Sequence, residues 1–238
     1  ACDAIRPVFE ASKGDAGYVS LEVSPALADD EAGTVAAARR LAAAVARANL
    51  LVKIPATAAG VRAIETLIGE GLSINVTLMF SLAHVDAVAG AYQRGLEKLA
   101  ANGGEVSRVR SVASVFLSRW DSLVDTLLAD IGTPEALALR GKAGVALARQ
   151  AYQHYLARFH GAGFAALAAR GGRPQSMLWA STGTKRWFVC TECHNPHNVQ
   201  HGDRNRGFAQ HQPEKAPSLP KGMKTADHER HPHGTSDH

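Results

Sequence analysis

Short β-rich apolar runs alternate with longer runs rich in alanine and leucine through most of this 238-residue chain. The short runs are typical of strands and lie at residues 18–23, 50–54, 72–78, 109–116 and 177–181. The longer runs are typical of helices and lie at about residues 30–48, 58–69, 81–100 and up to residue 170. This alternation predicts parallel βα units, arranged either as a doubly wound sheet or as a (β/α)₈ barrel. No glycine-rich phosphate fingerprint follows a strand, which argues against a nucleotide-binding sheet.

The run "LLVKI" is apolar except for Lys53 and predicts a strand buried on both faces. A buried amine loses hydration, so the site must supply it with partners or hold it neutral. Other polar residues also stand at or near the C-terminal ends of strands, namely Glu22, Asn75, Thr77 and Ser114. Any one of them alone could be a satisfied core group. In a barrel, however, these strand ends converge on the face where active sites are built, so together they favour a barrel and a site for carbonyl chemistry through a lysine Schiff base.

Composition narrows the function classes further. The net charge of +4 is spread over predicted helices that also carry Asp and Glu, so we expect no nucleic-acid partner. No run is long and apolar enough to span a membrane, and the first residues do not resemble a secretory signal. Three cysteines do not form a disulfide framework. These features together predict a cytoplasmic protein.

The composition changes near Lys185. Eight of the eleven histidines and two of the three cysteines follow it, among many Pro and Gly and few large apolar residues. Such a segment buries too little apolar surface to offset its ordering entropy. We therefore expect two parts: residues 1–185 as a barrel-like domain and residues 186–238 as an irregular tail rich in Cys and His.

The tail contains "CTECH", in which Cys190, Cys193 and His194 have the spacing of a c-type haem attachment motif. With "NPHN" after it, the segment resembles the last haem segment of a multihaem cytochrome c. A zinc site is an alternative, and it would use the two thiols with two of the histidines His194, His197, His201 and His211. A third reading is an accidental fusion or frame error that binds neither group. Covalent haem attachment requires export, so we expect haem c to be absent.

Several motifs resemble transaldolase in its bacterial form: "SLEVSPAL", "LLVKIPATAAGVRAIETLIGEGLSINVTLMFS", "SVASVFLSRWD", "GKAGVALARQAYQ" and "RPQSMLWASTGTK". The resemblance covers residues 1–185 and implies a TIM barrel of the class I aldolase type. The implied reaction moves a dihydroxyacetone unit from sedoheptulose 7-phosphate to glyceraldehyde 3-phosphate in the pentose phosphate pathway. It implies sugar phosphate substrates and neither a metal nor an organic cofactor.

The resemblance also implies roles for residues. Lys53 matches the Schiff-base lysine, and Glu22 and Thr77 match the pair that positions a catalytic water. The residues matched to substrate binding are Asn75 for the dihydroxyacetone unit, Ser114 and Arg119 for substrate hydroxyl and phosphate, and Phe116 for the pocket wall.

The chain also departs from that family pattern. In the family, two strands precede the one that matches the Glu22 strand; the first carries a catalytic aspartate and the second a substrate-binding asparagine. A further strand and helix follow the segment that matches "WASTGTK". This sequence offers no match for those two strands or for the last strand and helix. We therefore expect an incomplete barrel with five of eight strands and impaired activity. An inactive gene fragment joined to unrelated sequence is the alternative.

Overall fold

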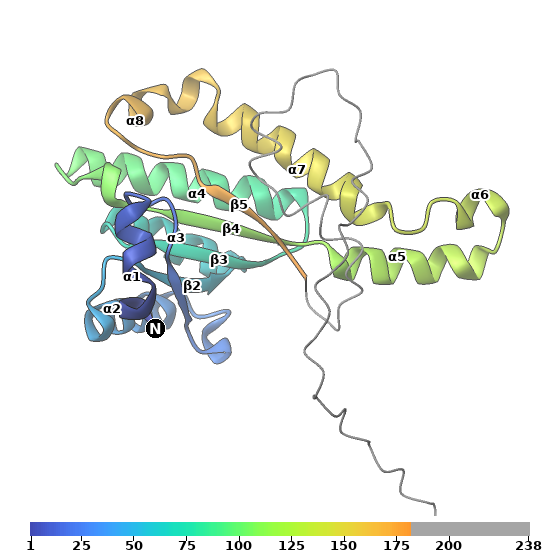
Figure 1. Ribbon diagram of the computed structural model, residues 1–238, viewed down its shortest axis with the longest axis horizontal. Coiled ribbons are helices and arrows are strands. Elements are labelled where there is room, and N and C mark those ends of the chain that lie inside the picture. Colours follow the sequence, from blue (N-terminus) through green and yellow to red (C-terminus); the bar gives the residue numbers. More distant parts are fainter. Residues whose placement is uncertain (182–238) are drawn as a thin grey trace, which may run out of the picture. The chain divides into compact units, whose positions relative to one another are not determined.

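The computed structural model describes residues 1–181, which contain one five-stranded sheet with the order β1-β2-β3-β4-β5 (Figure 1). Every neighbouring pair of strands is parallel. The strands are β1 (Val19–Glu22), β2 (Leu50–Pro55), β3 (Ile74–Met79), β4 (Ser111–Phe116) and β5 (Ser176–Ala180). Each lies within two residues of a strand predicted from the sequence. The predicted α/β class with parallel βα units is therefore confirmed.

Among residues 1–181 one helix precedes β1, one helix lies between each successive pair of strands from β1 to β4, and four helices lie between β4 and β5. The helices are α1 (Cys2–Ala11), α2 (Glu31–Val45), α3 (Ala58–Gly69), α4 (Leu82–Ala101), α5 (Ser118–Ile131), α6 (Pro134–Leu137), α7 (Ala143–Phe159) and α8 (Ala165–Ala169). Single 3₁₀ turns lie at η1 (Pro25–Leu27), η2 (Val106–Arg108) and η3 (Ala162–Phe164). The helical region that follows β4 is thus divided, and Figure 1 shows α5 and α6 beyond the carboxyl end of β4. No helix among residues 1–181 is long and apolar enough to cross a membrane.

The core lies between one face of the sheet and the helices that pack on it. Alternate strand residues such as Val52, Ile54, Ile74 and Val76 are almost completely buried there. Helices α2, α3 and α4 pack against this side, and α7 packs on α4. Side chains alternate between the two faces of a strand, so the residues between these core positions point to the opposite face. That opposite face carries the polar residues singled out above.

The strands run directly into helices that begin with side-chain caps. Thr57 accepts a hydrogen bond from the backbone N–H of Gly60 at the start of α3, two residues after β2 ends. Ser81 does the same for His84 at the start of α4, two residues after β3 ends. Each cap satisfies a backbone donor that the first helical turn leaves without a partner. The carboxyl ends of β2 and β3 are therefore held by short, well-defined turns.

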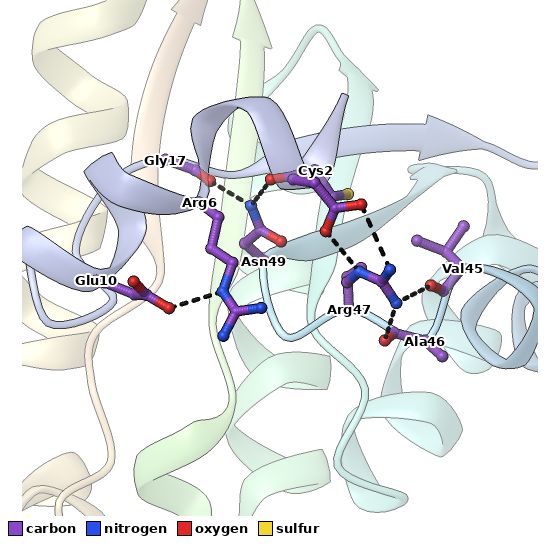
Figure 2. A network of polar contacts seen from close by, with 9 residues as sticks. Cys2, Arg6, Glu10, Gly17, Val45, Ala46, Arg47 and Asn49 are labelled. Carbon is purple, nitrogen blue, oxygen red and sulfur yellow. Dashed lines mark hydrogen bonds and ion pairs between the residues drawn. The ribbon is translucent and has the colours of Figure 1, made fainter.

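At the other end of the strands, α1 is attached through Asn49, which precedes β2 (Figure 2). The buried Asn49 amide donates to the carbonyl of Cys2 at 2.9 Å and to that of Gly17 at 3.0 Å. Gly17 has a positive φ of 80°, and a Cβ at this position would collide with the backbone of Phe9. Glycine is therefore needed where the chain turns from α1 into β1.

We expect Asn49→Ala to lower the free energy of unfolding by about 2 kcal/mol, because two backbone carbonyls lose a hydrogen bond in a buried setting. Urea unfolding followed by circular dichroism measures the change. Asn102→Ala, at an exposed position after α4, is the matched control and should stay within about 0.5 kcal/mol of the unaltered chain. An equal effect of the two substitutions would contradict the attachment of α1 through Asn49.

Candidate functional site

The parallel register places three of the predicted site residues side by side. Glu22 on β1 is paired with Lys53 on β2, and Lys53 is paired with Asn75 on β3. All three side chains project from the face opposite the helix-covered core. An acid, an amine and an amide from three consecutive strands therefore meet on one surface.

The amine of Lys53 has a direct carboxylate partner. Its Nζ lies 3.2 Å from Oε2 of Glu22, and the two side chains are 29% and 45% exposed. The sequence predicted a strand buried on both faces. Within the described residues the neighbours of Lys53 in β2 are indeed buried, but Lys53 itself is only partly buried. Its amine is accessible from the open face and keeps a charged partner, which together remove the cost of burying an unpaired cation.

This face of the sheet lines a cavity of about 600 Å³. Its lining residues are Ser20, Glu22, Lys53, Asn75, Thr77, Leu78, Ser114, Phe116, Leu178, Ala180 and Ser181. On β1, β3, β4 and β5 pairs of lining residues are spaced by two, as the alternation of side chains in a strand requires. Six of the seven residues that the sequence assigned to the barrel site therefore share one cavity.

A chain of hydrogen bonds crosses the cavity between β4 and β1. Ser114 Oγ donates to Oδ1 of Asn75 at 2.9 Å, and Nδ2 of Asn75 donates to Ser20 Oγ at 2.9 Å. The amide of Asn75 is thus held at both ends. Its second N–H has no protein partner among residues 1–181 and can bind a ligand.

Thr77 presents an unusual polar atom. The residue is only 1% exposed, and its Oγ1 has no hydrogen-bond partner within the described part of the chain. Next to it the β3–β4 register shifts between Val76 and Met79, and Leu78 has a positive φ of 59°. A left-handed backbone conformation is unfavourable for leucine. Bulges and strained residues of this kind are found often at functional sites.

Two predicted substrate-binding residues meet near Phe80, which follows β3. The rings of Phe116 and Phe80 lie 5.5 Å apart between centroids, and the guanidinium carbon of Arg119 lies 5.6 Å from the centroid of the Phe80 ring. The backbone carbonyl of Phe80 also accepts a hydrogen bond from the indole of Trp120. Phe116 lines the cavity, whereas Arg119, in the first turn of α5, is not among its lining residues.

Sequence reasoning missed several lining residues. Ser20 could have been found, because it lies two positions before Glu22 and must share its face of the strand. Leu78 could not, because a bulge without glycine leaves no mark in the sequence. The remaining missed residues are Leu178, Ala180 and Ser181.

No group of three or more metal-binding side chains occurs among residues 1–181. The predicted haem or zinc residues Cys190, Cys193 and His194 lie outside the described residues.

The fold and the site together define an α/β protein in which a lysine and a carboxylate lie side by side at the carboxyl ends of neighbouring parallel strands. The chain belongs to the Transaldolase/Fructose-6-phosphate aldolase family, which it matches over residues 1–188. The family resemblance of the sequence is therefore confirmed.

Individual relatives agree with this assignment. The chain is 60% identical over 185 residues to a transaldolase of Thiobacillus denitrificans, an alignment that covers 78% of this chain and 52% of the relative. It is 51% identical over 185 residues to a transaldolase of an Arthrobacter species, covering 78% and 50%. The match to a transaldolase of Mycobacterium ulcerans is 49% identical over 205 residues, covering 84% and 55%. The chain thus spans about half the length of the curated relatives it matches.

The unpaired hydroxyl of Thr77 predicts an unusual response to substitution. Thr77→Val should leave the free energy of unfolding unchanged or raise it by about 1–2 kcal/mol, because a buried hydroxyl without a partner costs about that much. The comparison is Thr34→Val, at a position that is also 1% exposed, where Oγ1 donates to the carbonyl of Leu27 at 2.9 Å. That variant loses a hydrogen bond and should be less stable by about 1 kcal/mol. Equal losses in urea unfolding of both variants would show that Thr77 is paired in solution.

Proposed function

We propose that this chain carries the Schiff-base site of a transaldolase, which transfers a dihydroxyacetone unit from sedoheptulose 7-phosphate to glyceraldehyde 3-phosphate. The observation that carries the proposal is the position of Lys53: its amine opens into the cavity, 3.2 Å from the carboxylate of Glu22. Family membership supports the reaction class, since the relatives above bear the name transaldolase.

The first proposed step is imine formation. Glu22 accepts a proton from the Lys53 ammonium, and the neutral amine attacks the ketone carbon of the donor sugar. The C–N bond forms, the carbonyl oxygen takes up protons and leaves as water, and a protonated imine remains on Lys53. A water held by Glu22 and Thr77 would carry protons between these groups. The buried Thr77 hydroxyl, which has no partner among residues 1–181, supports such a role.

The second proposed step is carbon–carbon cleavage. The hydroxyl next to the breaking bond gives its proton to a base, which in the family pattern is the aspartate on a strand that precedes the one matching β1. The aldehyde half of the sugar departs, and the bonding electron pair moves into the imine to give an enamine. The enamine then attacks the acceptor aldehyde, and hydrolysis restores the lysine. The protonated imine is the electron sink, so this chemistry requires neither a metal nor an organic cofactor.

We assign substrate contacts from the same cavity. The second N–H of Asn75 would donate to a hydroxyl of the dihydroxyacetone unit, and Ser114 would contact a neighbouring hydroxyl while Phe116 forms the wall. Arg119 is proposed to bind the phosphate. Its place in the first turn of α5, directly after β4, puts it at the carboxyl end of the sheet, where barrel ligands bind.

Covalent trapping tests the assignment of the lysine. Borohydride added with fructose 6-phosphate should reduce the imine to a stable secondary amine, seen by mass spectrometry as one sugar-derived adduct. Lys53→Ala should abolish the adduct. Lys142→Ala removes an exposed lysine at the start of α7 and should leave the adduct in place. An adduct that survives in Lys53→Ala would reject Lys53 as the nucleophile.

We also propose that residues 1–185 form the barrel-type unit and that residues 186–238 are not part of its core. Support comes from the family match, which ends at residue 188, and from the change of composition at Lys185. A chain shortened to end at Lys185 should unfold at the same urea concentration as the full chain and give the same yield of adduct. A lower midpoint for the shortened chain would place the tail in the fold.

A further inference from the structure

The hydroxyl of Ser20 lines the cavity but takes no part in the proposed reaction steps. Ser20 lies on β1 two residues before Glu22, so both side chains project from the same face. It is exposed toward the cavity, and its Oγ accepts a hydrogen bond of 2.9 Å from Nδ2 of Asn75. This contact joins two strands that are not neighbours in the sheet, because β2 lies between β1 and β3.

The intervening strand explains why Ser20 and Asn75 find each other. On this face β2 presents Lys53, which is occupied by Glu22, and two residues earlier Leu51, which is apolar and buried. Among the described residues, the amide of Asn75 is therefore the polar group that hydrogen-bonds to Ser20 across β2. Ser20, Asn75 and Lys53 all line the same cavity, so the bond belongs to the same polar surface as the amine.

The contact between Ser20 and Asn75 leaves hydrogen-bond donors of both residues available to a ligand. Asn75 Oδ1 is engaged by Ser114, and one Nδ2 proton is engaged by Ser20. The hydroxyl of Ser20 accepts this bond, so its own proton is not used by Asn75 and can be donated into the cavity. Ser20 therefore both fixes the plane of the amide and offers a second donor beside it.

We propose that Ser20 is a substrate-positioning residue. It locks the Asn75 amide in the orientation that points its remaining N–H at the ligand, and its own O–H donates to a hydroxyl next to the carbonyl of a bound hydroxyketone. The inference rests on the proposed function, since it assumes that the ligand is a ketone attached to Lys53. With Ser20 on β1, the residues that contact the ketone come from four strands rather than three, since Lys53 lies on β2, Asn75 on β3 and Ser114 on β4.

Trapping with two small ketones tests the contact with the ligand. Dihydroxyacetone carries hydroxyls on both sides of the carbonyl, whereas acetone carries none. In Ser20→Ala the dihydroxyacetone concentration needed for half-maximal borohydride trapping should rise about five- to tenfold, the range expected for loss of one hydrogen bond. The concentration of acetone needed should not change. Ser20→Thr keeps the hydroxyl and should restore the value for dihydroxyacetone.

Ser122→Ala is the matched control, because it removes an exposed serine hydroxyl on α5, away from the cavity lining, and should change neither value. Equal changes for both ketones in Ser20→Ala would show a general disturbance of Lys53 and would overturn the proposal. So would unchanged values for both ketones.

A second measurement does not depend on catalysis. The side-chain amide signals of Asn75, identified by their loss in Asn75→Ala, should exchange with solvent several-fold faster in Ser20→Ala than in the unaltered chain. An unchanged exchange rate would overturn the hydrogen bond itself. If the amide responds but no ketone is trapped by the unaltered chain, the positioning contact stands, while the proposed function and the contact of Ser20 with a ligand both fail.

Discussion

The parallel register of β1, β2 and β3 is the constraint on which the site depends. It aligns Glu22, Lys53 and Asn75 in one row across the sheet, because paired residues of parallel strands project to the same side. A slip of one residue in any of these strands would turn its polar side chain into the helix-covered core. The apolar residues on the core face make such a slip costly, so the packing of the core also holds the geometry of the site.

One face of the sheet packs in the core and the other lines the cavity, and residues of both faces alternate along β2. Val52 and Ile54 are buried under the helices, while Lys53 between them opens into the cavity beside a carboxylate. The aliphatic stem of the Lys53 side chain can pack on apolar neighbours, while its amine avoids the full cost of burying a cation. This position suits the proposed role of Lys53 in a Schiff base, because the amine must exchange its proton and still be reached by a ketone.

Two locally unfavourable features lie next to each other at the site. Thr77 buries a hydroxyl without a partner among residues 1–181, and Leu78 next to it has a left-handed backbone within a bulge. Each of these features costs free energy that an ordinary strand would not lose. They are tolerated because the surrounding apolar residues of β3 and the capped start of α4 hold this segment on both sides. Such local exceptions are expected where a surface is shaped for binding rather than for stability.

The sequence by itself determined the alternation of strands and helices and the strand-end positions of the polar residues. It did so because hydrophobic periodicity is a local property and because parallel strands place their carboxyl ends together. Only the tertiary structure decided that Lys53 is partly open to the cavity, that Arg119 lies beside Phe80, and that Ser20 reaches Asn75 across β2. The docking of α1 on Asn49 was likewise invisible beforehand. These are contacts between segments distant in the chain, and their geometry depends on the register, the bulge at Leu78 and the packing of the helices, which no local pattern of residue types encodes.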